Sequence, residues 1–160
     1  LCSFILSQCN NIPRIKSIIR RLCEDFGEPL CEGWYAFPSP ERLAGLSEND
    51  LSALRAGYRT RYILSAAQAV ASGALDLELL RTLPADEARE RLTTLPGVGR
   101  KVADCVLLYG LSHLEAFPVD TWMKKALREH GMPDLTPFRD SAGVVQQYIF
   151  HYMRETSRAG

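Results

Sequence analysis

The stretch Leu95-Pro96-Gly97-Val98-Gly99-Arg100-Lys101 is the most informative part of the sequence. It separates one helical pattern, which begins near Ala85, from a second that runs to Tyr109, so residues 85–109 are predicted to form a helix-hairpin-helix. Two glycines allow backbone angles closed to other residues and a close approach to a phosphate, while the free amides of the second helix point to the same place. The pattern therefore predicts a small anion-binding site.

The rest of the chain is also helical in pattern. Apolar residues recur at helical spacing, as in Ile12, Ile15, Ile18 and Leu22, and no convincing alternating strand appears. Glycine and proline breakers divide the sequence into roughly seven or eight short helices. We therefore expect a single all-α domain over residues 1–160, a bundle of short helices with no substantial sheet.

Composition excludes several classes of protein but favours no partner. Nineteen basic and nineteen acidic side chains give a formal charge of zero, so a case for DNA binding must rest on local motifs. The five cysteines form neither a CxxC pair nor a cysteine-histidine cluster, which argues against a disulfide framework or a zinc site. No apolar run reaches the roughly 20 residues that cross a bilayer, and the start lacks the basic flank of a signal peptide. We expect an intracellular protein that does not enter a membrane.

A second motif follows the hairpin at a fixed distance. Pro118-Val119-Asp120 comes nineteen residues after Lys101, and Asp120 precedes a helical pattern as an N-cap would. Residues 95–104 and 117–120 together resemble the helix-hairpin-helix DNA glycosylase (HhH-GPD) superfamily. Within it, Lys101-Val102-Ala103-Asp104-Cys105 resembles the 8-oxoguanine DNA glycosylases, and the resemblance covers nearly the whole chain.

Lys101 and Asp120 suit the chemistry that the resemblance implies. A carboxylate stabilises the oxocarbenium character of a breaking glycosidic bond, which suits Asp120, and an unprotonated amine is a nucleophile, which suits Lys101. In the implied mechanism Lys101 attacks C1′, displaces the base and forms a Schiff base, so the enzyme is both a glycosylase and an AP lyase. From the residues alone, a solvated lysine and a plain N-cap remain open.

The final helical segment carries the predicted base pocket. Gln146 and Phe150 are four residues apart and share a helix face. The resemblance places Gln146 on the Watson-Crick edge of a flipped base and Phe150 against its ring, with Cys105 on the opposite face. The alternative is a surface amide, a core aromatic and an inert buried cysteine.

The resemblance also implies a set of DNA contacts. Arg14 and Arg59 would contact the estranged cytosine, with Tyr58 as a wedge. The full set of predicted DNA-binding residues is Asn10, Asn11, Arg14, Tyr58, Arg59, Gly97, Val98, Gly99 and Trp122. Cys9 stands where the family presents a further asparagine, and Thr121-Trp122 where better-known members carry a phosphate-contacting histidine, so opposite-base discrimination and local DNA contacts are expected to differ.

Further expectations concern cofactors, partners and completeness. The resemblance suggests a structural cation on the backbone carbonyls of Thr93, Leu95 and Val98, with no metal held by side chains. No iron-sulfur cluster is expected because no cysteine follows Cys105. The partner is duplex DNA with a damaged base, bound by a monomer in the compartment that holds DNA. Because the chain opens on Leu1 in what reads as helix interior, we expect a fragment that lacks an amino-terminal sheet domain.

Two alternatives remain open from the sequence. One is a helix-hairpin-helix glycosylase for another damaged base, an oxidised pyrimidine or an alkylated base; the alkylated-base type would not need Lys101. The other is a non-catalytic DNA-binding module that keeps the hairpin as a phosphate grip. A trapped covalent intermediate separates this module from the lyase.

Overall fold

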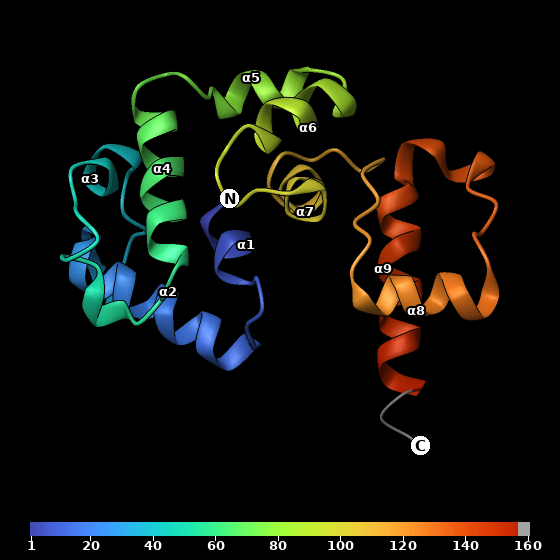
Figure 1. Cartoon of the computed structure of the whole chain (residues 1–160), viewed down its shortest axis with the longest axis horizontal. Coiled ribbons are helices and arrows are strands. Elements are labelled where there is room, and N and C mark those ends of the chain that lie inside the picture. The colour runs from blue at the N-terminus through green and yellow to red at the C-terminus, as the bar shows by residue number, and fades with distance from the viewer. Residues whose placement is uncertain (157–160) are drawn as a thin grey trace. The chain divides into compact units, whose positions relative to one another are not determined.

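The computed structural model describes residues 1–156. Figure 1 shows helices joined by short loops, in agreement with the predicted all-α fold. The helices are α1 (Cys2–Leu6), α2 (Ile12–Phe26), α3 (Pro40–Ala44), α4 (Arg59–Ala71), α5 (Leu77–Thr82), α6 (Ala85–Thr93), α7 (Arg100–Gly110), α8 (Thr121–His130) and α9 (Ala142–Thr156), with short 3₁₀ turns η1 (Ser52–Leu54) and η2 (Thr136–Ser141). None of these helices is both long and apolar enough to cross a membrane.

The chain forms two compact units. The first unit comprises residues 1–77 and 94–97, and the second comprises residues 78–93 and the described residues from Val98 onward. In the first unit α3 packs against α4, and α1 packs against both α2 and α4. Fully buried aliphatic side chains from these helices form its core: Ile5, Leu6, Ile18, Leu22, Leu43 and Ile63.

A small hairpin of strands interrupts the helices of the first unit. Strands β1 (Pro29–Cys31) and β2 (Trp34–Tyr35) pair antiparallel, and Gly33 between them has φ +74°. The sequence analysis found no strand here because both segments are too short to show alternation and all their residues are exposed. The expectation of no substantial sheet is nevertheless confirmed.

The second unit carries the helices on which the predicted chemistry depends. Helix α6 packs against α7, and α8 packs against α9. Every residue of α7 from Val102 to Leu108 is buried, so this helix is the centre of the unit. At the start of α9, a Cβ on Gly143 would lie 2.5 Å from the Ala116 carbonyl oxygen and 2.5 Å from Leu108 Cδ1. The absence of a side chain at Gly143 therefore lets α9 approach the carboxyl-terminal half of α7.

Candidate active site

The hairpin loop requires glycine at one of its two glycine positions. Gly97 has φ +79°, and a Cβ there would lie 2.3 Å from Cδ2 of the Tyr62 ring. Gln8 Nε2 donates to the Gly97 carbonyl oxygen at 2.9 Å, which fixes the loop within the first unit. Gly99 is the N-cap of α7 in an extended conformation, and within the described residues no side chain caps this helix. The first-turn amides of α7 therefore keep the donor capacity expected of an anion-binding site.

Lys101 lies in the first turn of α7 and is half-buried. Its side chain hydrogen-bonds to the thiol of Cys105, one turn later on the same helix face. Burial raises the pKa of the Cys105 thiol; the Lys101 charge opposes this rise, while the carboxylates of Asp104 and Asp120 add to it. Lys101 and Asp120 therefore both act on the same thiol, and the second unit brings them together.

Asp120 has the N-cap geometry that its position in the sequence predicts. Its Oδ1 accepts a hydrogen bond of 2.8 Å from the backbone N–H of Met123, in the first turn of α8. The residue has extended backbone angles and is half-buried. A carboxylate at this position is stabilised by the positive end of the helix dipole, and the cap holds it in one orientation.

Tyr109 is a member of this cluster that the sequence analysis missed. It follows Cys105 by four residues on α7, and its ring is about half exposed. Burial raises the pKa of its phenol, as do the nearby Cys105 and Asp120. Lys101, Cys105 and Tyr109 therefore form one stripe along α7, and the i, i+4 spacing after Lys101 is the signal that would have found it.

Helix α9 carries the other predicted pocket residues. Gln146 is only 2% exposed, and its Oε1 accepts a hydrogen bond from the Gln147 side chain. Phe150 lies one turn later and is half-buried. The packing of Gly143 against Leu108 brings this helix to α7. That Gln146 and Phe150 enclose a base together with Cys105 stays a prediction.

In the first unit, the two predicted asparagines make internal hydrogen bonds. Asn10 Nδ2 donates to the Leu6 carbonyl oxygen at 3.0 Å. Asn11 caps α2, because its Oδ1 accepts from the backbone N–H of Arg14 at 3.0 Å. Cys9, just before them, has φ +46° and is exposed. These bonds shape the turn between α1 and α2, and DNA contacts by the two asparagines stay a prediction.

Arg59 is buried, unlike an exposed arginine that is free to contact a DNA base. The residue is 5% exposed, and its Nε donates to the Gln8 carbonyl oxygen at 2.8 Å. The two terminal nitrogens donate to the carbonyl oxygens of Gln8, Cys9 and Ala56. The guanidinium therefore holds the α1–α2 turn, and a contact with cytosine requires some of these bonds to be exchanged.

The remaining predicted contacts vary in exposure. Arg14 is exposed and donates from Nη2 to the Arg55 carbonyl oxygen at 3.0 Å, and Tyr58 is 45% exposed with the Arg59 guanidinium 4.5 Å from its ring centre. Val98 is buried, and Trp122 is half-buried in the first turn of α8. Their DNA contacts stay predictions.

The side chains do not test the cation predicted at the hairpin loop. Among residues 1–156, no group of three or more histidine, cysteine, aspartate or glutamate side chains is placed to hold a metal ion. Thr93 and the buried Leu95 and Val98 lie around the hairpin loop. A cation on their carbonyl oxygens stays a prediction.

A helix-hairpin-helix with a half-buried lysine in the first turn of its second helix, and an aspartate that caps a later helix, is the arrangement that the sequence analysis linked to the helix-hairpin-helix superfamily. The family model described as "HhH-GPD superfamily base excision DNA repair protein" matches residues 2–141. The chain belongs to this superfamily, as the sequence analysis predicted.

Individual relatives agree in their names. The "Probable N-glycosylase/DNA lyase" of Methanothermobacter thermautotrophicus is 31% identical over 98% of this chain. The "N-glycosylase/DNA lyase OGG1" of Arabidopsis thaliana is 37% identical over 84% of it. The crystal structure of Clostridium acetobutylicum 8-oxoguanine glycosylase/lyase with DNA containing cytosine opposite 8-oxoguanine superposes with a TM-score of 0.86, at 36% identity over 97% of the chain. The chain spans 60%, 39% and 58% of the lengths of these three proteins, respectively.

Proposed function

We propose that this chain is the helical catalytic part of a bifunctional DNA glycosylase and AP lyase that removes 8-oxoguanine from duplex DNA. One observation carries the proposal. Lys101 is half-buried in the first turn of α7 and hydrogen-bonds to the Cys105 thiol, and the capped carboxylate of Asp120 raises the pKa of the same thiol. A non-catalytic phosphate grip requires neither the lysine nor the aspartate. The named relatives with DNA lyase activity support the same reaction.

The reaction follows from these groups. The Lys101 amine attacks C1′ of the damaged nucleotide, and the bond from C1′ to the base breaks with its electron pair leaving on the base, which takes a proton. The Asp120 carboxylate stabilises the positive charge that develops on the sugar. Opening of the sugar ring then gives a Schiff base on Lys101. Loss of a C2′ proton expels the 3′ phosphate and breaks the strand, and water releases the lysine.

Recognition of the base would fall to the α7 stripe and α9. A flipped base needs a partner for its edge and apolar surfaces for its faces. Gln146, nearly inaccessible on α9, offers an amide with both donor and acceptor, and the buried thiol of Cys105 is kept neutral by its raised pKa. We assign the base edge to Gln146 and the two faces to Cys105 and Phe150.

A panel of damaged duplexes tests the substrate. Duplexes with 8-oxoguanine opposite each of the four bases, with 3-methyladenine, with an oxidised pyrimidine and with undamaged guanine are incubated with the protein, and the released bases are measured. We expect release of 8-oxoguanine from the duplex with cytosine, and strand breaks at the same sites. Release of 3-methyladenine without strand breaks would replace the proposal with an alkylated-base glycosylase.

A further inference from the structure

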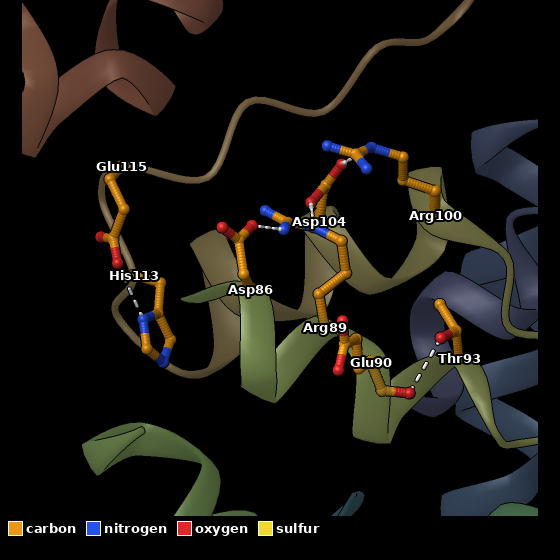
Figure 2. Close-up of polar contacts among 8 residues, drawn as sticks. All are labelled: Asp86, Arg89, Glu90, Thr93, Arg100, Asp104, His113 and Glu115. Atoms are coloured by element: carbon orange, nitrogen blue, oxygen red, sulfur yellow. Dashed lines mark hydrogen bonds and ion pairs between the residues drawn. The ribbon is translucent and has the colours of Figure 1, made fainter. Parts of the chain in front are cut away.

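A buried ion pair joins the two helices of the hairpin motif. Arg89 of α6 donates from Nε to Oδ1 of Asp104 on α7 at 2.5 Å, and their side chains are 13% and 5% exposed. The same guanidinium binds the carboxylate of Asp86, which is exposed. Figure 2 shows Arg89 between these two carboxylates, with Arg100 on the other side of Asp104.

The pair is too buried to be an incidental surface contact. A buried carboxylate is costly unless it is paired, and removal of one partner leaves the other uncompensated. Burial disfavours the charged form of Arg89, but its bonds to Asp104 and Asp86 outweigh this and raise its pKa. A second cation, Arg100, interacts with Asp104 more weakly, because its Nε lies 3.9 Å from Oδ2 and its side chain is largely exposed.

Asp104 is close to the proposed nucleophile along α7. It follows Lys101 by three residues on α7, a spacing that places two side chains next to each other on a helix surface. It also directly precedes Cys105, and its charge acts on the thiol to which Lys101 bonds. Without Arg89, the cations left to this carboxylate would be the largely exposed Arg100 and Lys101, three residues before it on α7.

We propose that Arg89 is a positioning residue that neutralises the Asp104 carboxylate and so leaves the amine of Lys101 free to lose its proton. This inference rests on the proposed function, because only a nucleophilic lysine needs to lose its proton, whereas the charge effect itself depends on the ion pair alone. A carboxylate without its arginine would stabilise the ammonium form and hold it against α6. Arg89 therefore acts through Asp104 and does not contact the sugar.

The charged and titratable groups that interact with Asp104 or with the Cys105 thiol, the partner of Lys101, come from three elements. They are Arg100, Asp104, Cys105 and Tyr109 on α7, Asp86 and Arg89 on α6, and Asp120 at the start of α8. Asp120 is unchanged in every variant below, so its contribution is the same in each comparison. Differences between variants then report the pair formed by Arg89 and Asp104.

The proton of Lys101 can be followed directly. The chain contains four lysines, Lys16, Lys101, Lys124 and Lys125, so a protein labelled with ¹³C at lysine Cε gives few signals, and Lys101→Gln identifies the one of interest. The chemical shift of this signal is recorded from pH 6 to pH 12 for the wild type and for Arg89→Gln, Asp104→Asn, Arg89→Lys and the double variant Arg89→Gln/Asp104→Asn. Arg91→Gln is the matched control, because Arg91 is on the same helix in an exposed pair with Glu87.

We expect Arg89→Gln to move the midpoint of the Lys101 titration upward by about one pH unit. Asp104→Asn should move it downward, and the double variant should lie close to the wild type. Arg89→Lys should retain most of the wild-type value, and Arg91→Gln all of it. Far-ultraviolet circular dichroism checks that each variant is folded.

An unchanged midpoint in folded Arg89→Gln overturns the proposal, and so does an upward shift that persists in the double variant. If Arg89→Gln does not fold, an unchanged midpoint in Asp104→Asn overturns it equally. The proposed function is judged separately, by borohydride trapping of the wild type on an abasic duplex. The titration needs no DNA, so loss of trapping would remove the function while the charge effect stands.

Discussion

At the scale of single residues, the two glycines of the hairpin have different tasks. Gly97 combines a positive φ with a ring of Tyr62 at 2.3 Å from any added Cβ, whereas a Cβ on Gly99 would meet no atom within 4 Å. We expect Gly97→Ala to lower the free energy of unfolding by about 1–3 kcal/mol, through strain and overpacking. Gly99→Ala is the control and should change it by less than about 1 kcal/mol. Urea unfolding of both variants measures this, and equal losses would contradict the assignment.

Asp120 combines a structural and a chemical role that substitution can separate. Asparagine keeps an oxygen to accept from Met123 N–H, whereas alanine does not. Asp120→Asn should therefore keep stability within about 0.5 kcal/mol, while Asp120→Ala should lose about 1 kcal/mol. Because only the carboxylate stabilises the developing charge, both variants should lose base excision by about a hundredfold or more.

Single-turnover excision and thermal unfolding measure the two effects of Asp120 separately. Full activity in Asp120→Asn would reduce Asp120 to a helix cap.

The Cys105 thiol should react more slowly than an exposed thiol of this chain. Its pKa is raised, chiefly by burial, and only the thiolate reacts with iodoacetamide. At pH 8 its alkylation should be at least about tenfold slower than that of the exposed Cys31, and should accelerate as the pH rises through its raised pKa. Peptide mass spectrometry measures both rates. Fast alkylation at pH 8 would contradict a buried, protonated thiol.

The raised pKa of Cys105 also sets the direction in which the stability of the protein changes with pH. Folding favours the protonated thiol, so the contribution of Cys105 is fully present below the pKa of the unfolded thiol. It is lost as the pH rises through the higher pKa of the folded state. We therefore expect this loss of stability in alkaline solution.

At the scale of elements, the start of α9 depends on Gly143. An added Cβ would lie 2.5 Å from the backbone oxygen of Ala116, which cannot give way like a side chain. Gly143→Ala should therefore lower the free energy of unfolding by about 2 kcal/mol or more. Gly110→Ala is a control in the same unit, where only Val106 Cγ1 approaches, at 4.0 Å, and it should cost little. Chemical denaturation of the two variants decides between them.

The helices were predictable because helical periodicity and breakers are local signals. The hairpin motif over 85–109 appears as α6 and α7, and Asp120 caps α8 as its position predicts. The strands at 29–35 were not predictable, since a three-residue and a two-residue strand carry no period. A similar limit applies to Arg59, because burial of a charged side chain depends on carbonyl groups from distant residues.

The site residues divide in the same way, into those with a local sequence signal and those placed by long-range packing. Lys101, Cys105 and Asp120 could be predicted as neighbours because the motif places them at fixed spacings, and their roles in the reaction stay predictions. The partnership of Arg89 with Asp104 could not, since it joins residues fifteen apart on two helices and depends on how those helices pack. Long-range packing of this kind leaves no periodic signal in a sequence.

At the scale of the whole molecule, a neutral chain is proposed to bind a polyanion. With nineteen positive and nineteen negative side chains, affinity cannot come from net charge. The hairpin loop, the amides of α7 and a few exposed arginines would have to supply it locally. DNA binding should therefore show a shallow dependence on salt, with a slope that corresponds to a few phosphates, and fluorescence anisotropy at several salt concentrations measures it. A slope near that of ten phosphates would contradict local binding.

The most direct test of the central claim is the covalent intermediate. The protein is incubated with a duplex containing 8-oxoguanine opposite cytosine in the presence of borohydride, which reduces a Schiff base to a stable amine. We predict an adduct of protein and DNA that is retained in Lys16→Gln, lost in Lys101→Gln and absent with undamaged guanine. No adduct either with this duplex or with one containing an abasic site, from a folded protein that binds both, would contradict the lysine mechanism.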